Sequence, residues 1–76
     1  MIKVLVADAD IQQNAQCCKF LANDKELEIT NTTDGLTTLN TYFEIKPNIL
    51  ILSSNFSDIK YTDILNKLAQ DEYSKC

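Results

Sequence analysis

Residues 46–56 read KPNILILSSNF, and the apolar run in the middle of this stretch decides the fold class. Pro47 stops any preceding helix and favours an extended conformation at Lys46. Residues 49–52 form a short, unbroken apolar run, which is typical of a strand buried on both faces of a parallel sheet. The run ends at Ser53, where a polar loop begins. The stretch therefore predicts an apolar strand of an α/β protein.

Two further strands are predicted upstream of this stretch. Residues 3–7, KVLVA, again form an unbroken apolar run, whereas residues 27–31, LEITN, alternate apolar and polar side chains as an edge strand does. Helical periodicity predicts helices over residues 11–22, 36–45 and 61–70. The order β-α-β-α-β-α implies parallel strands, right-handed crossovers and helices on both faces of the sheet, in one domain that spans the whole chain.

Each helix is expected to turn one apolar stripe toward the sheet. Asp10 is a candidate cap for the first helix, because Gln13 follows it at capping-box spacing. Asp34 and Gly35 form a turn signal before the second helix. The stripes contain Ile11, Ala15, Cys18, Leu21 and Ala22 in the first helix, Leu36, Leu39, Tyr42 and Phe43 in the second, and Tyr61, Ile64, Leu65 and Leu68 in the third.

Charge and hydropathy exclude several classes of function. The 76-residue chain has a net charge of −4, and its basic residues are scattered lysines without a cluster. We therefore expect no binding of nucleic acid by this chain alone and no binding to an anionic membrane surface. No apolar run approaches the ~20 residues that span a bilayer, and the first ten residues do not resemble a signal peptide. A cytoplasmic protein is predicted.

Cysteine and glycine usage argue against metal and cofactor chemistry. The chain contains an odd number of cysteines, Cys17, Cys18 and Cys76. They have no C-x-x-C spacing and the chain has no histidine, so we expect free thiols and no zinc site. With one glycine in the chain, a phosphate-cradling glycine-rich loop is absent from the sequence. The sequence therefore predicts a protein that is not an enzyme and carries no cofactor.

Three segments of the chain resemble a response-regulator receiver domain, the flavodoxin-like module of two-component phosphorelay signal transduction. Residues 3–10, KVLVADAD, resemble its first strand and acidic loop. Residues 32–39, TTDGLTTL, resemble the turn into its second helix, and residues 46–56 resemble its third strand. The likeness covers nearly the whole chain and is nearest to receivers of the sporulation-regulator type. It implies half of a receiver fold, with three parallel strands in the order 2-1-3 and three helices.

The resemblance also implies that the phosphorylation chemistry of the family is lost. Asp8 matches the first residue of the family's acidic pair, Ala9 stands where the second acid belongs, and Asp10 follows it as part of a relic acidic site. Ser53 occupies the phosphoacceptor position. A neutral hydroxyl does not form an acyl phosphate, and one carboxylate is a poor ligand set for Mg²⁺. We therefore expect a degenerate pseudo-receiver with at most weak Mg²⁺ binding, for which Asp8 is the candidate ligand.

Three side chains near this position have alternative interpretations. Ser53 is either a site of ester phosphorylation or, as we favour, a hydroxyl that bonds the neighbouring backbone. Asp58 is either a displaced acceptor or, as we favour, an exposed acid at the start of the next helix. Asp8 is either a relic of a metal site or a side chain that binds backbone N–H groups at the start of a helix.

The third strand becomes an exposed edge in a sheet of order 2-1-3. Its residues are Ile49, Leu50, Ile51 and Leu52, with no charge among them to discourage pairing. We therefore predict completion of the fold by self-association, in which two chains pair these strands antiparallel in a six-stranded homodimer.

Two functions agree with this self-association and with the lost phosphorylation chemistry. The chain is either a non-enzymatic signalling module that binds itself or a protein partner, or the regulatory fragment of a longer DNA-binding response regulator that controls transcription.

Overall fold

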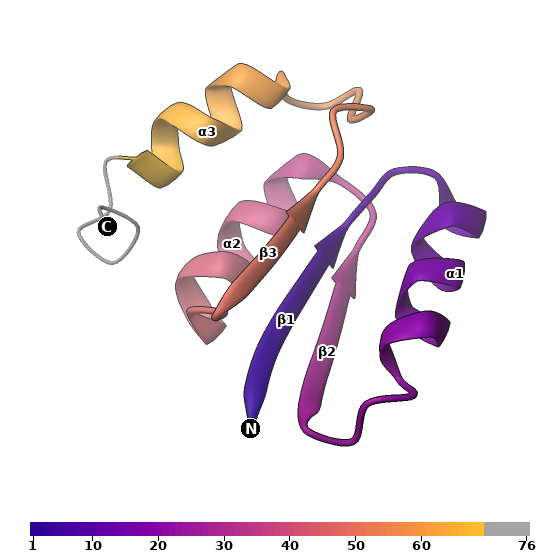
Figure 1. The fold of residues 1–76 in the computed structure, drawn as a ribbon. Helices are drawn as coiled ribbons and strands as arrows, with labels where there is room; N and C mark the ends of the chain where they lie inside the picture. The colour runs from indigo at the N-terminus through magenta and orange to yellow at the C-terminus, as the bar shows by residue number, and fades with distance from the viewer. Residues whose placement is uncertain (70–76) are drawn as a thin grey trace.

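The computed structural model describes residues 1–69, which alternate strands and helices in the predicted order (Figure 1). The predicted end of the third helix at residue 70 and the third cysteine, Cys76, lie outside the described residues. The elements are β1 (Ile2–Ala7), α1 (Ile11–Leu21), β2 (Leu27–Thr32), α2 (Gly35–Ile45), β3 (Ile49–Leu52) and α3 (Tyr61–Ala69).

The three strands form one parallel sheet in the order β2-β1-β3, as predicted. Val4 lies beside Ile29 on one side and Ile49 on the other, which sets the register of all three strands. Because neighbouring strands in register turn the same residues to the same face, Val4 and Ile49 share one face of the sheet. Helix α1 covers that face, whereas α2 and α3 cover the opposite one (Figure 1).

The main hydrophobic core lies between the sheet and the pair α2 and α3. Its buried members come from β1 and from these two helices, and half-buried apolar residues of β3 and the β3–α3 loop, together with the last residue of α2, pack against them. Burying apolar surface stabilises a fold by about 25 cal/mol per Å². The buried members are Leu5, Leu39, Tyr42, Ile64 and Leu68, and the half-buried ones are Ile45, Leu50, Leu52, Phe56 and Ile59.

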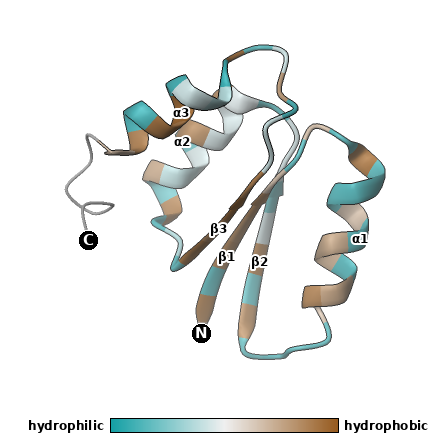
Figure 2. Cartoon of the chain, turned by 45° about the horizontal axis from the view of Figure 1, so that its top comes forward, coloured by the Kyte–Doolittle hydropathy of each residue, from teal (hydrophilic) through white to brown (hydrophobic). Residues whose placement is uncertain are grey.

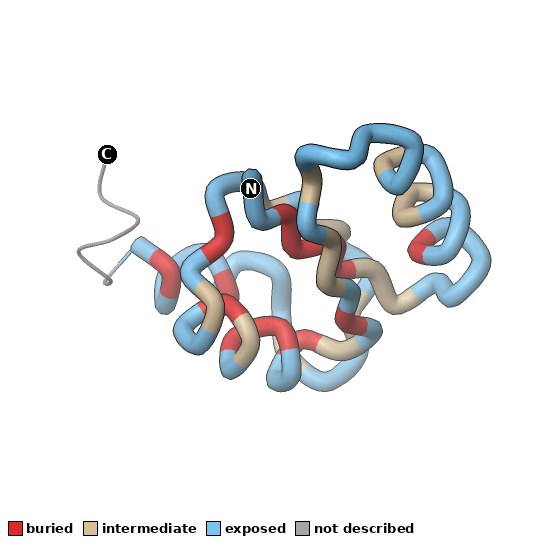
Figure 3. Tube along the Cα trace, turned by 90° about the horizontal axis from the view of Figure 1, so that it is seen from below, coloured by how far each residue is buried: buried red, intermediate tan, exposed pale blue. Residues whose placement is uncertain are grey.

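The opposite face of the sheet is covered unevenly. Helix α1 packs on β1 and β2 but does not reach β3 within the described part of the chain. Val4 and Val6 of β1 are each 1% exposed, whereas Ile49 and Ile51 of β3 are 46% and 39% exposed. Figure 3 shows buried segments in β1, α2 and α3, whereas α1 is mostly exposed.

The predicted apolar stripe of α1 is wrong at three of its positions. Ile11 is 73% exposed, and Ala15 and Ala22 are exposed too. The one buried residue of the helix is Asn14, at 1% exposure. The Asn14 amide bonds backbone carbonyls at the ends of two strands, so hydrogen bonding rather than the apolar stripe sets the rotation of this helix about its axis.

The predicted stripes of α2 and α3 are right at their centres and wrong at their flanks. Leu39, Tyr42, Ile64 and Leu68 are buried as expected. Helix α2 lies against β1, β2 and α3, and only the residues along these contacts are enclosed. The flanking positions remain partly open, at 56% exposure for Leu36, 42% for Phe43, 36% for Tyr61 and 42% for Leu65.

Lys46, which ends α2, has a left-handed backbone conformation rather than the predicted extended one. Lys46 has φ 48° and ψ 69°, and its N–H donates to the carbonyl of Tyr42 at 2.9 Å. A residue in this conformation commonly closes a helix, and here its own N–H is the group that satisfies a carbonyl of the last turn. The helix cap therefore overrides the extended conformation that Pro47 favours at the preceding residue.

The three helices of residues 1–69 are all too short or too polar to cross a bilayer.

Candidate functional site

The candidate site lies where the carboxyl ends of β1 and β3 meet. In parallel sheets the crevice outside these ends is where ligands usually bind. The loop after β1 brings Asp8, Ala9 and Asp10 to this end, and the loop after β3 brings Ser53 and Asn55. The register pairs Ala7 with Leu52, so Asp8 and Ser53 follow neighbouring residues of the sheet, as the sequence implied.

Asp8 is held by two N–H donors. Its Oδ1 accepts hydrogen bonds from the backbone N–H of Asp10 at 2.9 Å and from Nδ2 of Asn55 at 2.7 Å. The other amide atom of Asn55, Oδ1, accepts from the backbone N–H of Ala9 at 3.0 Å. We call this pair of bonds the Asn55 clamp. Asp8 therefore does bind backbone N–H at a helix start, and the clamp also joins the β1–α1 loop to the β3–α3 loop.

Sequence reasoning missed Asn55. Its side chain reaches Asp8, which lies 47 residues away in the chain, and nothing in the local sequence SSNF distinguishes it from any loop asparagine. The only available signal was its position shortly after the third predicted strand.

Asp10 faces α1 rather than Asp8. Its Oδ1 accepts from the backbone N–H groups of Gln12 at 3.0 Å and Gln13 at 3.1 Å, which confirms the predicted N-terminal cap. A carboxylate in this position also interacts favourably with the positive end of the helix dipole. The two acids of the relic acidic site are therefore engaged with different N–H donors.

Ser53 is half-buried, and only its backbone is tied into the sheet. Its N–H donates to the carbonyl of Ala7 at 2.9 Å, which continues the ladder between β3 and β1. Its hydroxyl makes no hydrogen bond to any residue between 1 and 69. The favoured interpretation, a hydroxyl bonded to neighbouring backbone, is therefore wrong for the part of the chain that the structure describes.

Asp58 is exposed, as predicted, but its carboxylate binds N–H groups at the start of α2 rather than at the start of α3. Its two carboxylate oxygens accept from the backbone N–H groups of Gly35 and Leu36, each at 2.9 Å. The hydrogen bond from Leu36, followed by that from Gly35, lowers the pKa of Asp58 below its ordinary value. Because this carboxylate is committed to the start of α2, it does not serve as a displaced acceptor beside Asp8.

A buried amide fixes the strand ends below the site. Nδ2 of Asn14 donates to the carbonyls of Asp8 at 3.0 Å and Thr32 at 2.8 Å, and its Oδ1 accepts from Nδ2 of Asn31 at 2.9 Å. These bonds join α1 to the carboxyl ends of β1 and β2. Buried polar groups that are fully hydrogen-bonded rigidify a site, so this network supports the position of Asp8.

The two adjacent cysteines lie on α1 and are free thiols, both half-buried. Burial, followed by the neighbouring Cys17, raises the pKa of the Cys18 thiol. Its Sγ lies 3.6 Å from Oδ1 of Asn14. A raised pKa favours the neutral thiol over the thiolate.

The site offers little for metal or phosphoryl chemistry. Among residues 1–69 no three side chains of Cys, Asp, Glu or His cluster as ligands of a metal ion do. Mg²⁺ is held by carboxylates and phosphate oxygens, and here Asp8 is a single carboxylate whose Oδ1 already accepts two N–H groups. The arrangement fixes two loops to each other and places a neutral hydroxyl beside them.

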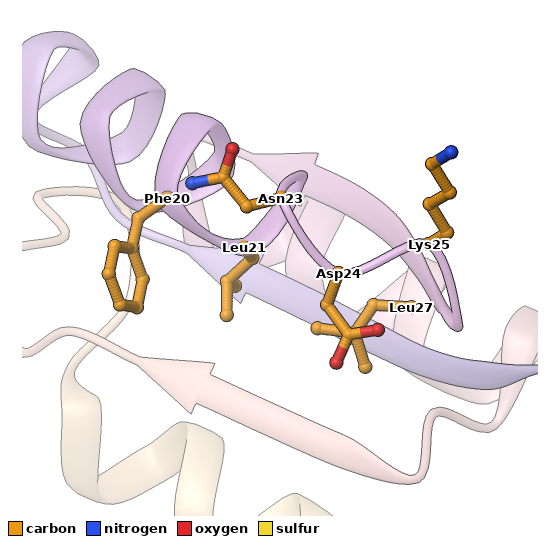
Figure 4. Close-up of a pocket in the computed structure, with 6 residues that line it drawn as sticks. All are labelled: Phe20, Leu21, Asn23, Asp24, Lys25 and Leu27. Carbon is orange, nitrogen blue, oxygen red and sulfur yellow. The ribbon is translucent and has the colours of Figure 1, made fainter.

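A separate pocket of about 480 Å³ lies at the opposite end of the sheet, between the end of α1 and the start of β2 (Figure 4). Phe20, Leu21 and Leu27 supply its apolar wall, and Asp24 and Lys25 stand beside them. It is far from Ser53 in the fold because the amino end of β2 and the carboxyl end of β3 lie at opposite ends of a parallel sheet.

No protein-family model, no curated protein and no solved structure matches this chain.

Proposed function

We propose that this chain is a non-enzymatic signalling module of the receiver type, which is not phosphorylated at position 53 and acts by binding a second copy of itself. The observation that carries the proposal is the set of side chains in the crevice at the carboxyl ends of β1 and β3. Ser53 follows β3 at the position that the resemblance assigns to the phosphoacceptor carboxylate, and Oδ1 of Asp8 accepts the side-chain amide of Asn55. The chemistry of phosphoryl transfer therefore has neither a nucleophilic carboxylate nor an acidic pair to bind Mg²⁺.

Self-association is supported by the edge of the sheet. β3 pairs with β1 on one side only, and no strand of residues 1–69 covers its other side. Figure 2 shows β3 as a uniformly hydrophobic strand, and its residues Ile49 and Ile51 remain partly exposed. An exposed apolar edge strand is a template for pairing with another chain. Binding through this edge gives the module a function that requires no phosphorylation.

The absence of phosphorylation is tested with acetyl phosphate and Mg²⁺, followed by intact-mass measurement. The wild-type chain is expected to gain no phosphoryl group. A phosphoryl adduct that disappears in Ser53→Ala and resists hydroxylamine, as a serine ester does, would overturn the proposal.

Self-association is tested by light scattering over a concentration series. The molar mass is expected to rise from that of one chain toward that of two. A mass that stays at the monomer value across the series would refute binding between copies.

A further inference from the structure

The free edge of β3 presents the backbone groups of Leu50 and Leu52. The Ser53 N–H points toward β1, because it donates to the carbonyl of Ala7. N–H and C=O groups alternate sides along a strand, so those of Ile51 also point toward β1 and those of Leu50 and Leu52 point outward. Within residues 1–69 no donor or acceptor pairs with these outward groups.

The faces of β3 are equally well defined. Leu50 and Leu52 pack against the core on the side of α2 and α3. Ile49 and Ile51 turn to the α1 side, where they are 46% and 39% exposed because α1 stops at β1. A partner strand must match this pleat, since a shift by one residue would put its side chains on the wrong faces.

From these two facts we infer that two copies pair through β3, antiparallel, with Ile51 on the two-fold axis facing Ile51 of the second copy. This inference rests on the proposed self-association and specifies its register. In this arrangement Leu50 lies opposite Leu52 of the second copy, and the reverse pair forms symmetrically. Both are hydrogen-bonded pairs, so every outward-pointing backbone group of β3 finds a partner.

A competing register that also respects the pleat, centred on Leu50, is weaker. It places Leu50 opposite Leu50 on the axis, and Leu52 then faces Asn48 of the second copy. The Asn48 N–H points inward, to the carbonyl of Lys3 at 2.9 Å. The outward carbonyl of Leu52 would therefore lack the N–H donor that it needs, and an unpaired backbone group that becomes buried costs about 1–3 kcal/mol.

The second copy is the occupant that fits this edge, because the edge complements itself. A strand of four residues is about 13 Å long, and its pairing buries less than the ~800 Å² per partner of a standard stable interface. The dimer is therefore weak and depends on concentration, so it must be tested near the concentration at which the scattering mass rises.

The test uses single cysteines in a background that carries Cys17→Ser, Cys18→Ser and Cys76→Ser. Ile51→Cys is expected to form a disulfide-linked dimer under mild oxidation, because facing residues of a non-hydrogen-bonded pair lie about 4.5 Å apart at Cα, within the range of a disulfide. Ile49→Cys is the matched control, since it lies on the same face with similar exposure. Its two copies would lie about 13 Å apart and are expected not to link.

Leu50→Cys separates the two registers. In the inferred arrangement residue 50 of one copy lies diagonally from residue 50 of the second copy, at about 7–8 Å. In the competing arrangement the two lie directly opposite each other. Preferential linkage through Leu50→Cys, or a dimer by light scattering with no linkage at Ile51→Cys, would overturn the register and leave self-association standing. A monomer at every concentration, with no linkage anywhere, would overturn both.

Discussion

Removing the amide of Asn14 is the sharpest test of how the candidate site is supported. Asn14 is 1% exposed, and Asn14→Ala deletes its bonds to the carbonyls of Asp8 and Thr32 and to the Asn31 side chain. In this variant the Thr32 carbonyl still accepts a hydrogen bond from the backbone N–H of Asp8, at 3.1 Å. The Asp8 carbonyl loses the hydrogen bond from the Asn14 amide. A buried acceptor left unsatisfied costs about 1–3 kcal/mol, and each lost bond costs about 1 kcal/mol.

We therefore expect Asn14→Ala to lower the free energy of unfolding by about 3 kcal/mol. The whole domain is expected to be stable by about 4–11 kcal/mol, at ~0.05–0.15 kcal/mol per residue, so this loss is large. The assay is urea unfolding at 25 °C followed by far-UV circular dichroism, at one fixed protein concentration so that self-association contributes equally.

The matched control is Gln16→Ala, an exposed position on the same helix. It removes no described hydrogen bond and raises helix propensity, so its effect should lie within about 0.5 kcal/mol. If Asn14→Ala and Gln16→Ala change the unfolding free energy equally, the amide network does not set the orientation of α1, and the reasoning fails.

Three further substitutions test the contacts between the loops. Asn55→Ala removes both bonds of the Asn55 clamp and should cost about 1–2 kcal/mol in urea unfolding, since the bonds are exposed to solvent. Gly35→Ala should cost about 1–3 kcal/mol despite its better helix propensity, because the new Cβ would overlap the side-chain methyl Cγ2 of Ile59. Asp58→Asn should make the free energy of unfolding fall less steeply as pH is lowered. The pKa of Asp58 is lowered in the folded state, so its contribution is present above about pH 4 and is lost as pH falls through the folded pKa.

Each substitution has a neighbouring control at an exposed position. Ser54→Ala accompanies Asn55→Ala, Asn40→Ala accompanies Gly35→Ala, and Asp63→Asn accompanies Asp58→Asn. Equal unfolding free energies for the Asn55 and Ser54 variants would contradict the clamp. An unchanged or raised stability for Gly35→Ala would show that Ile59 moves aside freely. Parallel acid unfolding curves for the Asp58 variant and the wild type would contradict the role of Asp58 at the start of α2.

The positions of the strands and helices could be predicted because their signals are local. The unbroken apolar runs became β1 and β3, and β3 has the predicted ends, Ile49 and Leu52. The alternating run became the edge strand β2, and Asp10 caps α1 as its spacing indicated. Each of these signals depends on residues within one turn or one strand of each other, so no knowledge of the rest of the fold was needed.

The contacts that build the candidate site could not be predicted in this way. Asn55 reaches Asp8 across 47 residues, and Asp58 reaches Gly35 across 23. An asparagine or aspartate in a loop has the same local sequence signature whether it binds solvent or a distant N–H group. The resemblance placed Asp8 and Ser53 at the same end of the sheet, but it gave no indication of the side chain that joins the two loops.

The sequence by itself determined the order of elements, the parallel sheet and the apolar edge strand, because periodicity, strand runs and the proline are encoded within short windows. Only the tertiary structure decided which face of α1 is buried, how Lys46 ends α2, and which N–H groups donate hydrogen bonds to Asp8. These depend on where the carbonyls and N–H groups of other elements lie after packing. In α1 the hydrogen bonds of Asn14 to two strand ends are buried, whereas Ile11, Ala15 and Ala22 of the predicted apolar stripe remain exposed.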